Sequence, residues 1–283
     1  EISRRACDGG DASACASLGS LYETGSAKVP VDYARAYQLY ERGCSGGAAY
    51  GCASVGRFLE RGVTVSVDLA RAATMYASAC NGGYAYACGD LGRLYVDGIG
   101  VATDLPRAVP LLERACDAGH AASCATVARV YRAGNASAAD LADSAHFEDK
   151  ACQLGAQSSC SMLASAYRLG RGVTRDETHA QQLYESACAG GDALGCSNIG
   201  KPRLALLREG WCMHDNWSAC ADVARQYDSG DGVVRESSRA ATFYEIACTH
   251  GDGPSCGALA RFHRDAYAQL ACALGQTQSC RTK

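Results

Sequence analysis

The sequence contains little proline and few aromatic residues, and what it lacks already excludes several classes of protein. Only 5 of the 283 residues are proline and 7% are aromatic, whereas glycine is frequent, with 32 residues. This composition favours helices joined by glycine turns over a sandwich of strands. No run of about 18 apolar residues is present, so we expect no membrane-spanning helix. The formal net charge is −3, so no strong basic field attracts nucleic acid.

The chain does not begin with methionine, and no secretion signal is recognisable at its start. We therefore expect a processed or partial product. With 48% apolar and 20% charged residues, the composition is that of a folded protein.

Cysteine is the residue that the sequence has in excess, with 18 in the chain. The cysteines form nine pairs whose members are always eight residues apart. Successive pairs begin 36 or 37 residues apart, except for two steps of 24. A period of this length indicates a repeat architecture. The pairs are Cys7 and Cys15, Cys44 and Cys52, Cys80 and Cys88, Cys116 and Cys124, Cys152 and Cys160, Cys188 and Cys196, Cys212 and Cys220, Cys248 and Cys256, and Cys272 and Cys280.

The cysteine spacing does not fit a metal centre. Structural zinc sites use cysteines two to four residues apart, and the sequence has no Cys-x-x-Cys motif for zinc, redox exchange or haem. A strictly paired, even set predicts nine disulfides, whereas buried free thiols, the alternative, would not need to come in pairs. Disulfides persist in oxidising compartments, that is, in secreted or periplasmic proteins, the ER lumen or the mitochondrial intermembrane space.

Each repeat reads as two helices, helix A and helix B, because apolar positions recur at steps of three and four on both sides of a glycine-rich stretch. The glycines end helix A. An acidic residue begins helix B, where a carboxylate can cap free N–H groups. This slot holds Asp68, Asp104, Asp140 and Asp176. Small residues at one position of helix A allow close helix packing, and tyrosines at another are expected to pack between units. The small residues are Gly56, Gly92, Ala128, Ala164 and Ala224, and the tyrosines are Tyr22, Tyr95, Tyr131, Tyr167 and Tyr227.

A glycine three residues after the first cysteine of a pair ends helix B and turns the chain into the next helix A. Asp215 is the exception in this slot. One cysteine closes helix B and its partner lies about one turn inside the next helix A. The short turn therefore brings the two together, and we expect a disulfide within each pair.

The motif Leu-Gly-x-x-Tyr-x-x-Gly-x-Gly-Val-x-x-Asp of residues 91–104, followed by Ala-x-x-Leu-Tyr-x-x-Ala in residues 180–187, resembles the Sel1-like repeat, a relative of the tetratricopeptide repeat. The resemblance covers essentially the whole chain. The added cysteine pairs are similar to those of the disulfide-rich branch, which includes the Helicobacter cysteine-rich proteins and the Sel1-repeat cytochrome c oxidase assembly factor of the intermembrane space. The resemblance implies a right-handed, all-α solenoid of about eight helix-turn-helix repeats stapled by disulfides.

We expect one solenoid domain over residues 1–283, but two units are 12 residues short. After Gly200 and after Asp265 the end of helix A, the glycine loop and the cap of helix B are missing. Either these units are truly shortened or loops are missing from the sequence. Terminal caps are not evident, so either more chain exists or a partner covers an end. The predicted units are 7–43, 44–79, 80–115, 116–151, 152–187, 188–211 (short), 212–247, 248–271 (short) and 272–283 (partial).

A cation recurs five residues after the second cysteine, and these residues are candidates for binding a partner. A ladder of cations on helix A could bind carboxylates or backbone carbonyls of a partner segment. The alternative is that they pair with acids of helix B, or with water. The cations are Arg57, Arg93, Arg129, Arg225 and Arg261, with Lys201 nominally in the same slot; the helix B acids are Glu41, Glu113, Asp149, Glu185, Glu209 and Glu245.

Motifs for catalysis are not found: no Gly-x-Ser-x-Gly, His-Glu-x-x-His or P-loop is present, and neither is Ser-x-x-Lys or Lys-Thr-Gly. The six histidines are scattered and predict no metal site. Trp211 and Trp217 flank one turn and are expected to pack locally, although tryptophan is also enriched in interaction hot spots. Two sequons, Asn135-Ala-Ser and Asn216-Trp-Ser, fall in predicted turns and would carry glycans only in a eukaryotic secretory protein.

We therefore predict a non-enzymatic interaction scaffold in an oxidising compartment, without a cofactor, metal, nucleic-acid partner or membrane span. Its resemblance to the intermembrane-space protein implies an assembly factor or accessory subunit of a larger complex. The alternative is a secreted or periplasmic penicillin-binding protein with weak β-lactamase activity, since some Helicobacter relatives have this property. In that case Arg93 and Arg129 would hold the β-lactam carboxylate, but the sequence supplies no nucleophile.

Overall fold

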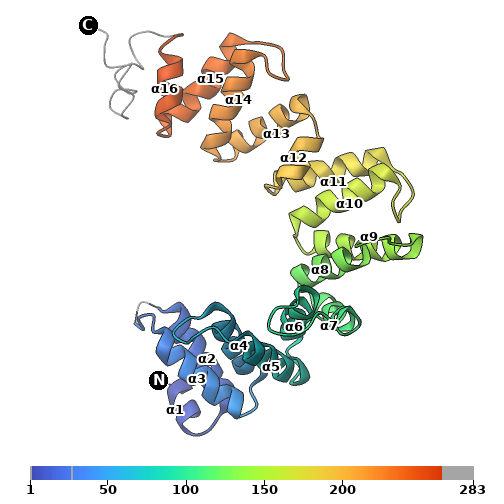
Figure 1. Cartoon of the computed structure of the whole chain (residues 1–283). Helices are drawn as coiled ribbons and strands as arrows, with labels where there is room; N and C mark the ends of the chain where they lie inside the picture. Colours follow the sequence, from blue (N-terminus) through green and yellow to red (C-terminus); the bar gives the residue numbers. More distant parts are fainter. Residues whose placement is uncertain (1, 27, 263–283) are drawn as a thin grey trace. The chain divides into compact units, whose positions relative to one another are not determined.

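The computed structural model describes residues 2–26 and 28–262, which form sixteen α-helices joined by short turns and loops (Figure 1). Within these residues the only β-type pairing is an isolated bridge between Ser26 and Val29. The predicted all-α repeat architecture is confirmed. The helices are α1 (Ile2–Asp8), α2 (Ala12–Thr24), α3 (Tyr33–Ser45), α4 (Ala49–Arg61), α5 (Leu69–Asn81), α6 (Ala85–Asp97), α7 (Leu105–Asp117), α8 (Ala121–Tyr131), α9 (Ala138–Gln153), α10 (Gln157–Leu169), α11 (Glu177–Ala189), α12 (Ala193–Asn198), α13 (Lys201–Met213), α14 (Trp217–Ser229), α15 (Ser237–Thr249) and α16 (Gly253–Leu259).

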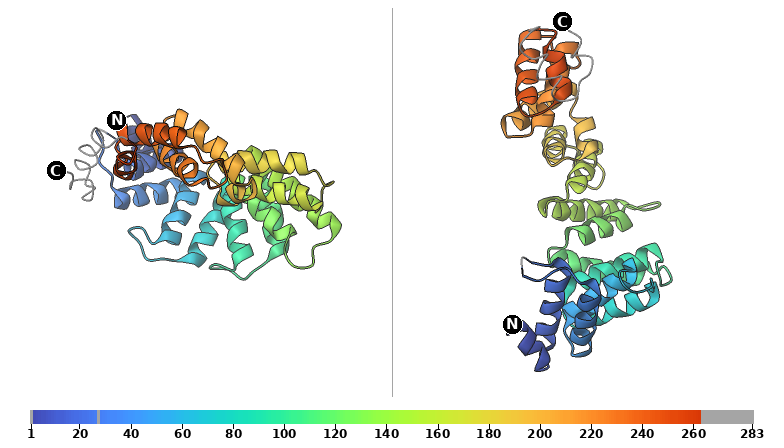
Figure 2. Two further views of the ribbon diagram at one scale, coloured as in Figure 1. Left: turned by 90° about the horizontal axis from the view of Figure 1, so that it is seen from above. Right: turned by 90° about the vertical axis from the view of Figure 1, so that its left-hand side faces the viewer.

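The chain divides into two compact units, Glu1–Leu183 and Tyr184–Lys283. In each unit a helix packs mainly on its neighbours in the sequence, and Figure 2 shows the helix pairs of the first unit side by side. From α2 onwards, even-numbered helices are A helices and odd-numbered helices are B helices. The single solenoid domain over residues 1–283 stays a prediction.

Aspartate caps begin most B helices as predicted. The side chain of Asp68 accepts a hydrogen bond from the backbone N–H of Arg71 in α5, at 2.9 Å. Asp104 accepts one from the N–H of Arg107 in α7, at 3.1 Å, and Asp176 accepts one from the N–H of His179. The prediction for Asp140 is wrong, because α9 begins earlier. Ser137 is its N-cap, and Asp140 lies inside the first turn, where the two residues form a reciprocal capping box.

The turns from helix B to helix A take the predicted backbone form. Every described glycine three residues after a first cysteine has φ between 89° and 95°, a left-handed conformation that glycine adopts without strain. Asp215 adopts the same region, with φ of 66°. These turns hold the two cysteines of each pair close together.

Eight disulfides link the cysteines of successive pairs from Cys7–Cys15 to Cys248–Cys256, each within its own pair. Their Cα atoms lie 4.4 to 4.8 Å apart. The described part of the chain contains no free cysteine. The ninth predicted bond, Cys272–Cys280, lies outside the described residues. A protein with these bonds is suited to an oxidising compartment.

The core of each repeat depends on small residues in helix A. A Cβ at Gly56 would lie 2.9 Å from the ring of Tyr76, and one at Gly92 would lie 2.7 Å from Cγ of Leu112. Both Tyr76 and Leu112 come from the following helix B and are almost completely buried. The prediction of close helix packing at this slot is therefore confirmed.

Two of the tyrosines further along helix A contact both their own repeat and the preceding one. Tyr131 stacks on Phe147 with ring centroids 5.8 Å apart, and Tyr227 stacks on Phe243 at 6.2 Å. Both phenylalanines belong to the B helix of the same repeat. The hydroxyls of Tyr131 and Tyr227 also donate hydrogen bonds to Glu113 in α7 and Glu209 in α13, which belong to the preceding repeats. The expected contact between units is therefore confirmed in these two repeats.

The two short units have reduced A helices. Helix α12 has six residues, and Gly200, with φ of 76°, leads directly into α13. Helix α16 ends at Leu259, short of the predicted end at Asp265. The junction after Asp265 lies outside the described residues.

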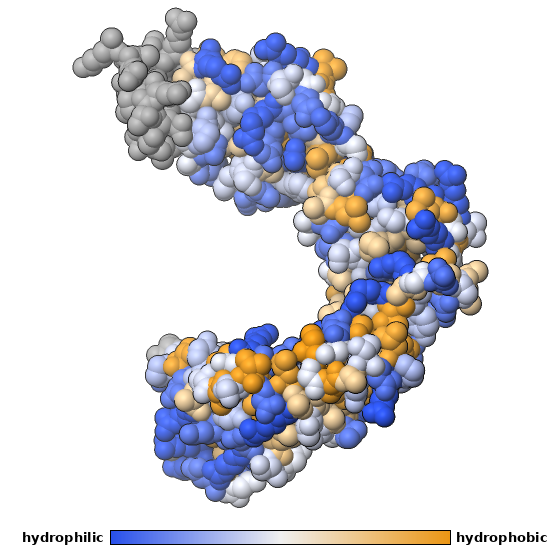
Figure 3. All heavy atoms as spheres, viewed as in Figure 1, coloured by the Kyte–Doolittle hydropathy of each residue, from blue (hydrophilic) through white to orange (hydrophobic). Residues whose placement is uncertain are grey.

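The surfaces of the units mix polar and apolar side chains (Figure 3). Exposed large apolar residues include Val31, Val67 and Leu105 in the first unit, and Met213 and Val234 in the second. No helix of the described part has the length and apolarity needed to cross a membrane.

Candidate interaction site

The arginines of helix A are held by a three-residue arrangement that we call the clamp. At the junction of α4, α5 and α6, Glu60 at the end of α4 accepts a hydrogen bond from the hydroxyl of Tyr76 in α5, at 2.8 Å. The other oxygen of Glu60 accepts one from Arg93 in α6, at 2.5 Å. Burial, followed by the charges of Asp90 and Glu60, raises the pKa of the Tyr76 hydroxyl above its usual range, so the hydroxyl remains a donor. The clamp links three helices from two successive repeats.

The same clamp recurs at other junctions. In the first unit Glu23 bonds the hydroxyl of Tyr40 at 2.6 Å and pairs with Arg57 at 2.7 Å. In the second unit Asp228 lies 2.8 Å from Arg261 and 3.4 Å from the hydroxyl of Tyr244. The repeat thus uses these arginines to hold neighbouring repeats together.

Two predicted ladder residues depart from the full clamp. Arg129 pairs with Asp97 at 3.1 Å, but the tyrosine slot there holds Leu112, which has no hydroxyl. Arg225 pairs with Asp222 of its own helix, because the preceding helix α12 is too short to supply an acid. Lys201 pairs with Asp231 at 2.5 Å.

The alternative, that these arginines pair with helix B acids, is not found at Arg57, Arg93, Arg129 and Arg261. Their acids lie at the end of the preceding helix A, because successive A helices lie side by side. The helix B acids bind other groups: Glu41 pairs with Arg71 and Glu209 with Arg239, both at the start of the next regular helix B. Among the rest, Glu113 accepts from Tyr131, Asp149 from Gln153 and Glu185 from Arg203.

A partner-binding role for Arg57, Arg93, Arg129, Arg225 and Arg261 stays a prediction. Arg93 and Arg129, which the penicillin-binding alternative assigns to a β-lactam carboxylate, already have carboxylate partners in Glu60 and Asp97. An added anion at either position would compete with an existing ion pair.

One junction breaks the clamp at all three positions. Between the repeat of α8 and α9 and that of α10 and α11, the acid slot holds Arg132, the tyrosine slot holds Glu148 and the arginine slot holds Ser165. Arg132 and Glu148 form an ion pair at 2.5 Å, and Ser144 donates a hydrogen bond to the carbonyl of Ala128 at 2.9 Å. In the sequence this junction is marked by the missing cation at position 165.

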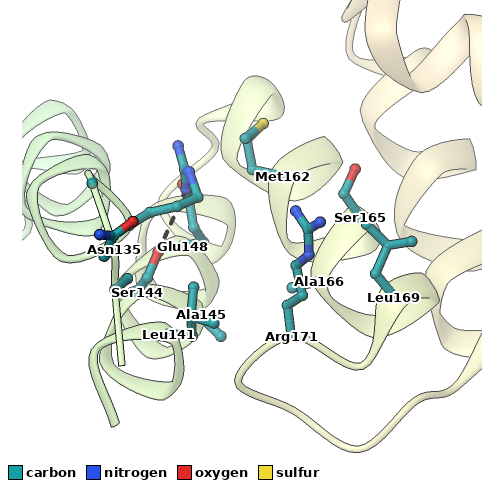
Figure 4. A pocket seen from close by; sticks show the side chains of 13 residues that line it. Asn135, Leu141, Ser144, Ala145, Glu148, Met162, Ser165, Ala166, Leu169 and Arg171 are labelled. Atoms are coloured by element: carbon teal, nitrogen blue, oxygen red, sulfur yellow. Dashed lines mark hydrogen bonds and ion pairs between the residues drawn. The ribbon is translucent and has the colours of Figure 1, made fainter. Parts of the chain in front are cut away.

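A pocket of about 300 Å³ lies at this junction, entirely within the first unit (Figure 4). One wall comes from α9 and the loop before it, and the other comes from α10 and the loop after it. In Figure 4 the side chain of Arg171 extends between the two walls. The lining residues are Arg132, Gly134, Asn135, Ala136, Leu141, Ser144, Ala145, Glu148, Met162, Ser165, Ala166, Leu169 and Arg171.

The pocket carries more positive than negative charge. Its charged residues are Arg132, Arg171 and Glu148. Arg132 is paired with Glu148, whereas the side chain of Arg171 has no hydrogen bond or ion pair with the described residues. Oxygen Oε2 of Glu148 is buried and has no hydrogen-bond partner there.

A second feature of the first unit is a row of aromatic rings at the first turns of three A helices, which we call the aromatic row. The ring centroids of Tyr50 and Tyr84 lie 5.7 Å apart, and those of Tyr84 and Tyr86 lie 5.8 Å apart. The centroid of Tyr86 lies 4.9 Å from that of His120. Tyr86 is 42% exposed. The row crosses α4, α6 and α8.

Asp90 lies beside the aromatic row and is half-buried, with no hydrogen bond or ion pair to the described residues. Burial raises the pKa of its carboxyl above the ordinary 3.8, although Arg93 and His120 nearby oppose the shift. Burial also lowers the pKa of His120. The row therefore combines aromatic faces with a carboxylate that the fold leaves unbonded.

Trp217, which follows the turn at Asp215, packs against the core of the second unit, as expected. Trp217 stacks on His250 with centroids 3.6 Å apart. Trp211 and His214 line a cavity of about 310 Å³ in the second unit. Asn216, of the second sequon, caps α14.

No cluster of three or more histidine, cysteine or acidic side chains suited to a metal occurs in the described ranges.

The fold is similar to that of solved bacterial structures. A protective antigen present in uropathogenic Escherichia coli strains, with an SLR fold, superposes with a TM-score of 0.70 and 20% identity over 98% of this chain. The chain spans 65% of the length of that protein. A Sel1 repeat protein from Oxalobacter formigenes superposes with a TM-score of 0.57 and 21% identity, over 83% of this chain and 84% of its own.

Helicobacter pylori cysteine rich protein B is 28% identical over 44% of this chain and 87% of its own, with a TM-score of 0.36. A comparison with functionally curated proteins found no match. The Sel1 repeat family model matches residues 12–47, 49–84, 85–120, 157–192 and 217–252, more than half of the chain. The chain is therefore a disulfide-rich member of the Sel1 repeat family.

Proposed function

We propose that the chain is a non-enzymatic protein-interaction scaffold, and that it serves as an accessory subunit or assembly factor of a larger complex. The compartment is oxidising, either the mitochondrial intermembrane space or a secreted or periplasmic location. The observation that carries this proposal is the aromatic row with Asp90 beside it. Aromatic side chains are enriched in the cores and hot spots of protein interfaces.

Two properties of the aromatic row support partner binding. Its rings come from three successive repeats, so a partner segment could contact them one after another. The disulfides Cys44–Cys52, Cys80–Cys88 and Cys116–Cys124 staple the turns that lead into these helices. A surface held in place in this way loses little conformational entropy on binding.

Asp90 indicates the charge of the partner group that we expect at the aromatic row. Its half-buried carboxylate raises the free energy of the folded chain, and a cationic side chain from a partner would offset this by forming a charge-assisted hydrogen bond. The neighbouring tyrosine faces also attract cations. We therefore expect a lysine or arginine of the partner to lie at the aromatic row.

The test is affinity purification from the native source without reduction, followed by mass determination with and without thiol alkylation. We expect a stable co-purifying assembly and no alkylatable thiol. The variant Tyr84→Ser with Tyr86→Ser should lose the assembly. Leu154→Ser, at a residue of the first unit that is 44% exposed and outside the aromatic row, is the matched control and should retain it.

An assembly that survives the double tyrosine variant would reject the aromatic row as the binding surface. A folded, oxidised protein that co-purifies with no partner would reject the scaffold role. Alkylatable thiols at the paired cysteines would reject the oxidising compartment.

A further inference from the structure

The pocket of Figure 4 lies where the clamp is replaced by a different set of residues. Three slots change together: acid to Arg132, tyrosine to Glu148 and arginine to Ser165. An arginine at position 165 would face Arg132 across the junction, so the serine is consistent with the reversed charge. The Sel1 repeat matches also omit residues 121–156, which contain two of these three positions.

The replacement opens space. Serine is much shorter than the arginine that fills this slot elsewhere, and Ser165 lines the pocket together with both members of the ion pair. The early start of α9, fixed by the capping box of Ser137 and Asp140, places Leu141 and Ser144 on the same wall. The pocket is therefore built from sequence changes that distinguish this repeat from its neighbours.

The chemistry of the walls defines an occupant. The side chain of Arg171 offers a guanidinium that no described residue binds, and its fork of donors fits a carboxylate. Leu141, Met162 and Leu169 supply an apolar surface next to it. The buried Oε2 of Glu148 is an acceptor that the described chain leaves unused, as expected where a ligand N–H completes the site.

We propose that this pocket binds a carboxylate next to an aliphatic side chain on a peptide segment of a partner protein. Arg171 binds the carboxylate, the three apolar side chains contact the aliphatic group, and Oε2 of Glu148 accepts a hydrogen bond from a backbone N–H of the peptide. The net positive charge of the lining favours an anionic group over a cationic one. This assignment rests on the proposed scaffold function and names a second class of partner contact, separate from the aromatic row.

The test selects binders to the folded, oxidised full chain from two random peptide libraries. In one library the peptides are fused at their C-terminus, so that only side-chain carboxylates are available. In the other they end in a free carboxylate. Enriched peptides are then synthesised with a fluorescent label, and their dissociation constants are measured by anisotropy.

Three variants give the comparison. Arg171→Glu reverses the charge of an exposed residue. The triple variant Arg132→Glu, Glu148→Tyr, Ser165→Arg rebuilds the regular clamp and fills the pocket, and circular dichroism verifies that it folds. Arg235→Glu, at an exposed arginine in the α14–α15 loop of the second unit, is the matched control.

We expect enriched peptides to carry an aspartate, a glutamate or a terminal carboxylate beside Leu, Ile, Val or Met. Their affinity should fall about tenfold or more in Arg171→Glu and in the triple variant, the loss expected for one charge-assisted contact. It should change less than about twofold in the control. The library that yields the binders identifies the source of the carboxylate.

Peptides without a carboxylate, or affinities that both pocket variants leave unchanged, would overturn the pocket assignment while leaving the scaffold function standing. Failure of both libraries to yield a binder would also overturn it. The scaffold function is judged separately, by co-purification with the wild-type chain.

Discussion

Arg132 and Glu148 form an ion pair where the regular clamp has a hydrogen bond between an acid and a tyrosine. The position of the acid holds Arg132, and the position of the tyrosine holds Glu148. The Arg132 side chain is 36% exposed, and that of Glu148 is only 4% exposed. The pair is therefore asymmetric: one partner can reach water and the other cannot.

This asymmetry predicts unequal effects of mutation. Arg132→Met leaves the buried carboxylate of Glu148 without a counter-charge and should lower the free energy of unfolding by about 3 kcal/mol. Glu148→Met leaves a guanidinium that can reach solvent and should cost about 1 kcal/mol or less. Urea denaturation followed by circular dichroism measures both. Equal losses would contradict the proposed burial asymmetry. Arg107→Met is the control, since Arg107 pairs with Asp104 at 70% exposure and should contribute little.

Two helical glycines predict opposite effects of the same substitution. Gly92→Ala places a methyl group 2.7 Å from Cγ of Leu112 and should destabilise the chain by about 1–3 kcal/mol through overpacking. A Cβ added at Gly210 in α13 would meet no described atom within 4 Å beyond its chain neighbours and the backbone of its own helix, so Gly210→Ala should stabilise the chain by about 0.5–1 kcal/mol. Thermal melting decides both signs. Stabilisation by Gly92→Ala would refute the close packing of α6 on α7.

Asp90 predicts a pH-dependent stability change. Burial raises the pKa of its carboxyl in the folded state above the ordinary 3.8, so the folded chain holds this proton more tightly than the unfolded chain does. The stabilisation from the protonated form is complete below about pH 3.8 and is lost as pH rises through the folded-state pKa.

Asp90→Asn should therefore raise the midpoint of thermal unfolding at pH 7 and have no such effect near pH 3. Melting curves across this range measure the difference. His120, whose pKa is lowered by burial, and the charges of Arg93, Glu60 and Arg57 face the same carboxyl. The control His120→Asn shows how much of the pH dependence comes from the titration of His120. A stabilisation that is the same at pH 3 and pH 7 would exclude the carboxyl charge as its cause.

We expect removal of one disulfide to reduce protection from hydrogen exchange locally rather than throughout the chain. Replacing Cys80 and Cys88 together by serine removes the closure of a short loop, worth about 2.5 kcal/mol in the chain-entropy model. Hydrogen exchange should accelerate first in the turn between α5 and α6. The turn between α14 and α15, far along the chain in the other unit, serves as the internal reference. Unchanged protection at the α5–α6 turn would show that the disulfide is not needed to hold it.

The local elements could be predicted because their causes are local. The eight-residue cysteine spacing, the glycine at most turns and the aspartate at the start of α5 or α7 act within a few residues along the chain. The failure at Asp140 has the same origin, because Ser137 is a competing cap three residues earlier and moves the start of α9.

The sequence by itself determined the helix pairs, their turns, the paired cysteines and the repeat family. Only the tertiary structure decided which acid each arginine meets, since Arg93 and Glu60 are 33 residues apart and approach through helix packing. It also decided that Arg132, Glu148 and Ser165 meet around one pocket. Side chains from different repeats become neighbours through the rotation and spacing of packed helices, and no short stretch of sequence contains that information.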